Sequence, residues 1–385
     1  FIFKKYKKYI KMKILFIISS ILLNALIVNS TFQSSIFSEV NLDYEGKNVI
    51  LSPLSIFQVL GLTTNGGVGI TQKEMISTLK TSSLDNLNSI NLKIIEKIKN
   101  FVSVELANGV MSIFEPIKSF SKVCDKYEAP IEKLISKKQV NDWCSKNTHG
   151  KITEILDELS PATVMLLLNA VYFRGEWTYP FDPEATKGGV FYNFGKEEKK
   201  VEMMTQLHEF NYYQDSKIQA IELPYKNDSM SALIILPNKD VDINEYINLY
   251  NVNDDFINTV IDQMMSTYVR LYLPKFEVGF YSKLKEVLQR LEMVTPFTGA
   301  ADFSGINGAG GLYIDDVIHK TYLKVDEIGS EAAGVTVVDM RKGLPSNVVE
   351  MEVNRPFIVI LRSSELPKNN DFLFMAKIEE ISDSN

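Results

Sequence analysis

DEIGSEAAGVTVVDMRKGLP, residues 326–345, combines the pattern of a strand with the composition of a loop. From Ser330 onward, every second residue is small or apolar, and the residues between them include the charged Glu331, Asp339 and Arg341. This two-residue period is typical of a strand with one buried face. Gly and Ala are nevertheless poor strand formers, and residues 341–345 read as an exposed, cleavable loop. The pattern therefore indicates a loop that could fit into a tight, half-buried space. Its small or apolar alternate positions are Ser330, Ala332, Gly334, Thr336, Val338 and Met340.

Length and composition set broad limits. The chain has 385 residues, which corresponds to two or three average domains or one large one. Its hydrophobic content of 45% is enough for an ordinary core. The net charge of −7 argues against a general nucleic-acid binder, which is usually basic.

The first thirty residues have the pattern of a targeting segment. Lysines precede an apolar run over residues 14–28, and Met12 is the first methionine. A charged start followed by an apolar middle predicts a secretory signal that begins at Met12 and is cleaved after Ser30. A membrane anchor is the alternative, but the run is shorter than about 20 residues and contains Asn24. We therefore expect residues 1–30 to be upstream sequence and signal, and residues 31–385 to form one domain.

Two further features depend on the compartment. Cys124 and Cys144 could pair in a secreted protein, or both could remain buried or free thiols. Asn227 begins an Asn-Asp-Ser sequon in a predicted turn, which is usable only if the chain is secreted.

Periodicity predicts a mixture of helices and strands. The segment 52–66 begins with a Ser cap and Pro53, and its apolar spacing is helical. By contrast, 163–175 is a continuous apolar run that predicts a strand buried on both faces. The fold class is therefore α+β. The other predicted helices are 89–102, 138–152 and 282–293, and the other predicted strands are 231–237, 269–278 and 357–364.

Local enzyme motifs fail when tested. HEFNY (208–212) lacks the second histidine of a zinc helix, and DVDINE (240–245) lacks the glycine of a calcium loop. NGGVGITQKE (65–74) lacks the third glycine and the lysine of phosphate-binding loops. A triad of dispersed residues would leave no local motif. We expect no enzymatic activity, no metal and no cofactor.

Motifs along the whole chain carry a resemblance. VIHKTYLKVDEIGSEAAG (317–334) closely resembles the strand and hinge that precede the reactive loop of serpins, the serine protease inhibitor superfamily. Six more segments resemble serpin signatures in the family's order, so the resemblance covers residues 29–378. They are NVILSPLSI (48–56), NAVYFRGEW (169–177), LPKF (273–276), DFSGI (302–306), NRPF (354–357) and FLFMAKI (372–378).

The resemblance implies a fold and a mechanism. It implies the serpin fold, with three β-sheets, about eight or nine helices and an exposed C-terminal reactive loop at about 327–350. A protease cleaves that loop, is trapped as an acyl-enzyme, and the loop inserts as a new central strand. The hinge residues implied are Glu327, Gly329, Ser330, Glu331, Ala332, Ala333, Gly334 and Thr336.

The resemblance also assigns polar residues around the sheet that receives the loop. Ser52, Ser55, Asn169 and His319 match the family's shutter, a buried hydrogen-bonded cluster under the centre of the sheet. Trp177, together with Glu327, matches the breach, where the loop first enters. Each has a simpler interpretation: Ser52 could be only a helix cap, His319 a satisfied core residue, and Trp177 ordinary core.

The position of the peptide bond that the protease cleaves follows from the loop length and from the side chain that precedes the bond. The family's commonest length places it at Gly343–Leu344, but glycine offers nothing to a specificity pocket. We therefore predict Lys342–Gly343, with Met340, Arg341 and Leu344 as alternatives. The partner would be a trypsin-like or broad-specificity serine protease in a covalent complex, or a cysteine protease.

Other partners and functions follow from the same comparison. Residues 78–105 and 127–141 are shorter than the family's usual helical region, so we expect no heparin site. We expect a monomer that binds no nucleic acid. The alternative function is a non-inhibitory serpin with a carrier, storage or chaperone role, although such proteins tend to carry charged or bulky residues on the inserting phase of the hinge.

Overall fold

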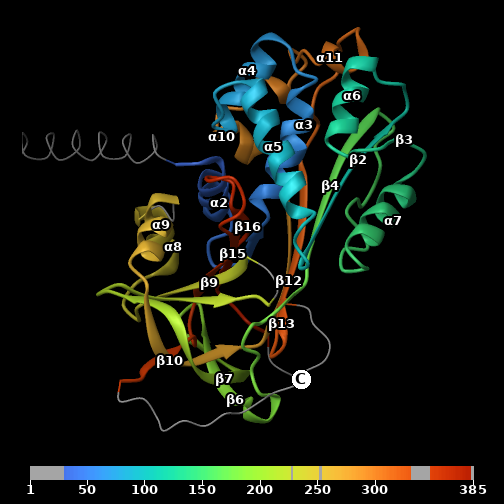
Figure 1. The fold of residues 1–385 in the computed structure, drawn as a ribbon. Helices are drawn as coiled ribbons and strands as arrows, with labels where there is room; N and C mark the ends of the chain where they lie inside the picture. The colour runs from blue at the N-terminus through green and yellow to red at the C-terminus, as the bar shows by residue number, and fades with distance from the viewer. Residues whose placement is uncertain (1–29, 227–228, 251–253, 331–346, 383–385) are drawn as a thin grey trace, which may run out of the picture.

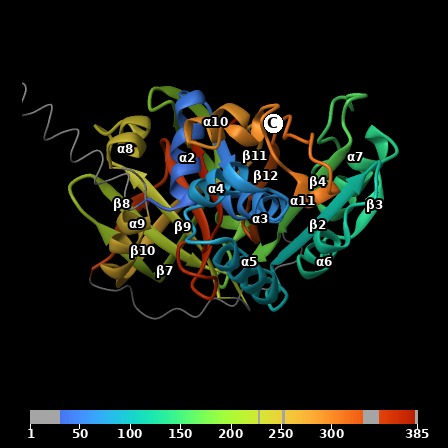
Figure 2. The same ribbon diagram turned by 90° about the horizontal axis from the view of Figure 1, so that it is seen from above.

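The structure is a computed structural model, and it describes residues 30–226, 229–250, 254–330 and 347–382. Helices α3, α4, α5 and α6 gather at one end of the molecule, and strands β6, β7 and β10 lie at the other (Figure 1). Seen from above, β2, β3 and β4 lie with α6 and α7 on one side, while α8 and α9 lie on the opposite side (Figure 2). The predicted α+β class is confirmed.

The largest sheet has nine strands and supplies much of the core. Its order is β1-β16-β15-β9-β8-β7-β10-β14, and β6 also pairs with β7. Three adjacent strands, β16, β15 and β9, are apolar along nearly their whole length and almost completely buried. The strands are β1 (Val49–Leu51), β6 (Lys187–Asn193), β7 (Glu197–Gln214), β8 (Ile218–Pro224), β9 (Met230–Pro237), β10 (Met265–Pro274), β14 (Val349–Glu352), β15 (Phe357–Ser363) and β16 (Phe372–Ile378).

Three smaller strand groups lie beside this sheet. The first has the order β3-β2-β4, with β3 Ile131–Lys133, β2 Val104–Ser112 and β4 Met165–Phe173. The second pairs β11 (Phe276–Lys283) with β12 (Ile318–Val325). The third pairs two short strands, β5 (Gly175–Glu176) and β13 (Gly329–Ser330). The three sheets expected from the resemblance thus form four hydrogen-bonded groups among the described residues.

Local signals explain where helices begin. The Ser52 hydroxyl accepts the backbone N–H of Ser55, and Pro53 occupies the first turn of α3. Thr31 caps α2 in the same way. The described residues contain ten α-helices: α2 (Phe32–Asp43), α3 (Pro53–Thr64), α4 (Gly69–Thr78), α5 (Leu84–Ile98), α6 (Lys118–Lys126), α7 (Lys137–Asn147), α8 (Ile243–Tyr250), α9 (Asp254–Asp262), α10 (Lys285–Arg290) and α11 (Ser304–Asn307). Two 3₁₀ turns, Pro183–Ala185 and Thr295–Phe297, complete the list.

The helices predicted over 89–102 and 138–152 form with shifted bounds, as α5 and α7, and three other predicted elements differ from the structure in extent or in burial. The segment 269–278 is two strands, because the chain leaves β10 at Pro274 and begins β11 at Phe276. The helix expected over 282–293 is only six residues long, because Ser282 and Lys283 still pair with β12. The third is the strand predicted over 163–175. It forms as β4, but most of its residues are only half-buried.

Other features bear on the targeting and cysteine predictions. Residues 1–29 lie outside the described residues, as does Asn227. No helix in the described ranges is long and apolar enough to cross a membrane. Cys124 and Cys144 are both free and buried, and burial raises the pKa of their thiols to about 12 and about 11 respectively.

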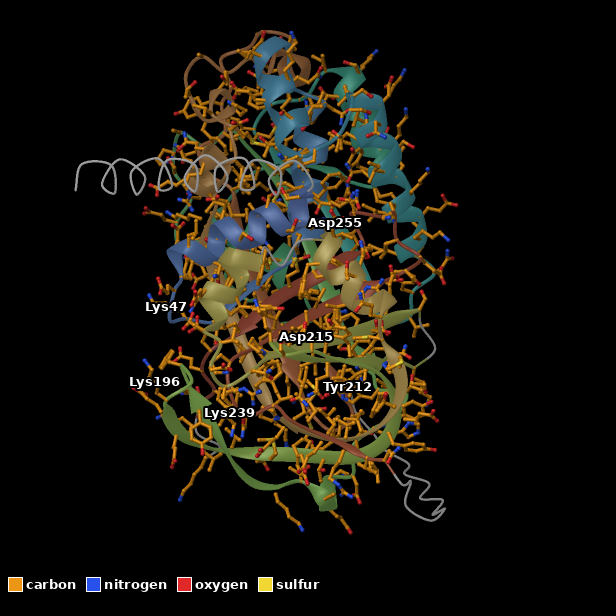
Figure 3. The ribbon with its side chains drawn as sticks, turned by 90° about the vertical axis from the view of Figure 1, so that its left-hand side faces the viewer. Lys47, Lys196, Tyr212, Asp215, Lys239 and Asp255 are labelled. Carbon is orange, nitrogen blue, oxygen red and sulfur yellow. The ribbon has the colours of Figure 1, made fainter. Side chains whose placement is uncertain are left out.

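On the face in Figure 3, lysines 47, 196 and 239 lie toward one side, and Asp215 and Asp255 lie nearer the middle.

Candidate functional site

A large cleft separates β4 from β12. Both strands run toward the short β5–β13 pair, and they spread apart in the direction of α11 (Figure 1). Among the described residues, β4 is hydrogen-bonded only to β2, and β12 only to β11, so the two facing edges have no strand partner. A cavity of about 810 Å³ lies between them and reaches α3 and α7. Unpaired edges of this kind are templates for an added strand.

The two faces of the cleft have different neighbours. Leu167 and Val171 of β4 pack on the main core together with α3, whereas Leu166 and Leu168 pack with Val140 of α7. In β12 the residues alternate between half-buried and buried positions along all eight residues. A strand entering the cleft would therefore place alternate side chains against the core and against α7.

Hydrogen bonds join the walls of the cleft to α3. The backbone N–H of Ser52 donates to Nε2 of His319 at 3.0 Å, and the Ser55 hydroxyl donates to Oδ1 of Asn169. The chain of bonds continues across the sheet, because Asn169 donates to Oδ1 of Asn108 at 2.7 Å. The four residues assigned to the shutter are therefore brought together by α3, β4 and β12. Ser52 is also the cap of α3, so the helix-cap interpretation is confirmed, and its shutter role stays a prediction.

His319 is held in its neutral form. The side chain is 6% exposed, and burial lowers its pKa from 6.5 to about 4. A neutral imidazole can accept the Ser52 N–H, whereas a doubly protonated ring has no acceptor. The bond from α3 to β12 therefore depends on His319 being unprotonated.

This gives a pH dependence with a definite sign. The unfolded chain binds a proton at His319 below pH 6.5, and the folded chain does so only below about 4. The stabilisation is therefore complete above pH 6.5 and is lost as the pH falls toward 4, by about 3 kcal/mol in total. Denaturant unfolding of the wild type and of His319→Gln at pH 7 and pH 4.5 measures this difference. An equal loss of stability in both proteins would contradict it.

At the other end of the cleft, the chain after β12 is fixed by Trp177 and Glu327. The indole N–H of Trp177 donates to the carbonyl of Asp326 at 3.0 Å, and its backbone N–H donates to the carbonyl of Ile328 at 2.8 Å. Burial disfavours the Glu327 carboxylate, but hydrogen bonds, including one from Thr186, and the nearby Lys275 ammonium outweigh it and lower the pKa. Trp177 and Glu327 thus both lie where the chain leaves β12, the place that the resemblance assigns to the breach.

The first hinge residues are already part of a strand. Gly329 is paired with Glu176, and Ser330 with Gly175, in antiparallel register. Ser330 is 1% exposed, so its side chain is buried in this structure. The remaining hinge residues (Glu331, Ala332, Ala333, Gly334 and Thr336) and the candidate reactive residues (Met340, Arg341, Lys342, Gly343 and Leu344) lie outside the described residues.

Comparison with known proteins identifies this arrangement. The sequence model described as "Serpin (serine protease inhibitor)" matches residues 28–381. The chain belongs to the serpin family. It is 34% identical to "Intracellular coagulation inhibitor 2" of Tachypleus tridentatus over 88% of this chain and 86% of that protein. It is 31% identical to "Leukocyte elastase inhibitor" of Xenopus laevis over 86% of this chain and 93% of that protein.

Structural comparison agrees. The crystal structure of tengpin, a thermophilic serpin in the native state, matches with a TM-score of 0.82 and 30% identity. The match covers 92% of this chain and 93% of tengpin. The serpin fold inferred from the sequence motifs is therefore confirmed, and two of these relatives are named as inhibitors, one of coagulation and one of leukocyte elastase.

Some residues of this serpin's site have no counterpart in the sequence prediction. Asn108 accepts a hydrogen bond from Asn169, Thr321 donates to the carbonyl of Ile50 at 2.6 Å, and Tyr225 contacts Ser330. Thr321 shares the buried phase of β12 with His319, so the strand period could have revealed it. The sequence contains no local signal for Asn108 or Tyr225, because their contacts join distant segments.

Proposed function

We propose that this serpin inhibits proteases as a suicide substrate. Its reactive loop is cleaved, the protease is trapped as an acyl-enzyme, and the cleaved loop inserts between β4 and β12. The observation that carries the proposal is the cleft itself, with two unpaired strand edges and a cavity of about 810 Å³. The Gly329–Ser330 pair with β5 adds support, because it places the start of the loop at the mouth of the cleft.

The chemistry needs only the protease's own catalytic groups. The protease serine attacks the carbonyl carbon of Lys342, and the peptide bond to Gly343 breaks. The new α-amino group of Gly343 leaves with the proton that the protease histidine took from the serine. An ester then links Lys342 to the protease. Insertion carries this ester away before water can hydrolyse it.

The target is a trypsin-like or broad-specificity serine protease, with a cysteine protease as the alternative. Lys342 supplies a cation for an acidic specificity pocket. Met340, Arg341 and Leu344 are the alternative positions before the cleaved bond. The serpin acts as a monomer and provides no catalytic group of its own.

A single incubation with trypsin tests both the inhibitory mechanism and the position of the cleaved bond. Trypsin mixed with the serpin should give a complex that survives boiling in SDS, and mass spectrometry of the released C-terminal peptide should begin at Gly343. A peptide that begins elsewhere contradicts the choice of bond. If trypsin-like, chymotrypsin-like and cysteine proteases all fail to form a complex, the protein is non-inhibitory, and a carrier, storage or chaperone role replaces inhibition.

We also propose that this serpin is secreted and glycosylated at Asn227. Helix α2 begins at Phe32 with Thr31 as its cap, so cleavage after Ser30 would leave the cap in place. The alternative is a cytoplasmic protein, and one relative is named an intracellular inhibitor. Expression from Met12 in cultured animal cells should release protein that begins at Thr31. Peptide N-glycosidase should shift its mass, and Asn227→Gln should abolish the shift. Retention of uncleaved protein in the cells would contradict secretion.

A further inference from the structure

The contact between Tyr225 and Ser330 joins the loop to the core before any cleavage. Their hydroxyl oxygens are 2.8 Å apart, and the two residues are 2% and 1% exposed. Among the described residues, the Tyr225 hydroxyl has Ser330 as its hydrogen-bond partner. If the hinge moved out, this buried hydroxyl would lose that partner, and a buried hydroxyl without a partner is unfavourable.

Tyr225 is itself held from its other sides. Its ring stacks on Trp177, with centroids 4.5 Å apart and planes 14° apart, and it meets Phe173 edge-on at 4.8 Å. Its backbone N–H donates to the carbonyl of Met230 at 2.9 Å. The hydroxyl that meets Ser330 therefore sits on a fixed ring.

The glycines at this point allow the backbones to approach closely. A Cβ added to Gly329 would lie 1.9 Å from the carbonyl oxygen of Gly175, and one added to Gly175 would lie 2.5 Å from the Tyr225 ring. No side chain fits at either position without moving the backbone or the ring. The close packing leaves Ser330 as the first hinge residue with a side chain inside the sheet, directly against Tyr225.

We infer that Tyr225 is a positioning residue for loop insertion, because its bond to Ser330 helps to hold Gly329 and Ser330 as a strand end that already exists. After cleavage, insertion extends this strand end down the cleft and does not have to nucleate a new one. Nucleation orders several residues before their contacts form, whereas extension orders them one at a time. The inference rests on the proposed function and identifies the contact that starts the insertion.

The experiment uses the two tryptophans of the chain. In a Trp143→Phe background, Trp177 is the only indole, and it lies between Tyr225 and the carbonyl of Asp326. Tyr225→Phe, Ser330→Ala and the double variant are compared in this background. Acrylamide quenching of Trp177 is measured on the intact proteins, and the stoichiometry of inhibition is measured with trypsin.

Loss of the bond should shift the ratio of released to inserted hinge about fivefold, which corresponds to about 1 kcal/mol. Each single variant should raise both quenching and stoichiometry, and the double variant should match the singles, because both remove the same bond. The control is Tyr212→Phe, which removes another buried tyrosine hydroxyl, bonded to Gln214 and Gln219, and should change neither reading.

Additive effects in the double variant would make Tyr225 a packing residue only and would overturn the inference, as would unchanged quenching in both singles. Failure of the proposed function is distinguishable, because it would appear as no covalent complex in the background protein itself. The quenching measurements do not depend on a protease and would still decide whether the bond holds the hinge.

Discussion

Cleavage of the loop between residues 340 and 345 is expected to make this serpin more resistant to heat, the reverse of ordinary nicking. The inserted loop would pair with both unpaired edges of the cleft, the nine residues of β4 and the eight of β12. A dozen new strand residues, at about 1 kcal/mol of net stabilisation per hydrogen bond, give on the order of 10 kcal/mol. For a chain of this size, that corresponds to a rise in Tm of more than about 10 °C.

The intact fold would then be a kinetically trapped state. Scanning calorimetry of intact protein and of protein nicked by a catalytic amount of protease measures the change. A nicked protein that melts at or below the Tm of the intact one would rule out insertion. A variant with Pro in place of Thr336 is a useful control, because proline lacks the N–H that a central strand needs and should reduce the gain.

Ser330→Arg is expected to convert the inhibitor into a plain substrate. Ser330 is 1% exposed and faces Tyr225, so an arginine there would be an unpaired buried cation or would force the hinge out of the sheet. Burying a charge without a partner typically costs about 3 kcal/mol or more. If this cost fell on the insertion barrier, insertion would slow about a hundredfold. Hydrolysis of the acyl-enzyme would then occur first.

The matched control is Glu331→Arg, one residue further on the phase that already carries charge. It should keep most of the inhibition. The measurement is the stoichiometry of inhibition of both variants with one susceptible protease. Equal stoichiometries would mean that the alternation in residues 330–340 is not an insertion pattern.

The sequence predicts the parts of the fold that have local causes. The cap and proline at residues 52 and 53 place the start of α3, and the apolar run of residues 163–175 predicts β4. Strand β2 gives no such signal, because Asn108 and Gly109 interrupt its apolar pattern and are poor strand formers. The structure explains why position 109 is a glycine, because a Cβ there would lie 3.0 Å from the Trp143 ring of α7.

The candidate site was predictable only where a motif carries it. Ser52, Asn169 and His319 lie in recognisable segments, and the structure brings them together. The half-burial of β4 could not be read from its sequence. A continuous apolar run predicts burial on both faces, but it does not reveal that one edge borders a cleft. The partnership of Tyr225 with Ser330 joins residues 105 apart, which no period of a strand or helix can indicate.

Hydrogen–deuterium exchange of intact and nicked protein tests loop insertion most directly. It reports on β4, on β12 and on residues 331–340 in one experiment. After nicking, exchange in 331–340 should become as slow as in a central strand, and exchange in Met165–Phe173 and Ile318–Val325 should slow at the same time, because each gains a hydrogen-bonded neighbour. Fast exchange throughout 331–340 in the nicked protein, with β4 and β12 unchanged, would contradict loop insertion.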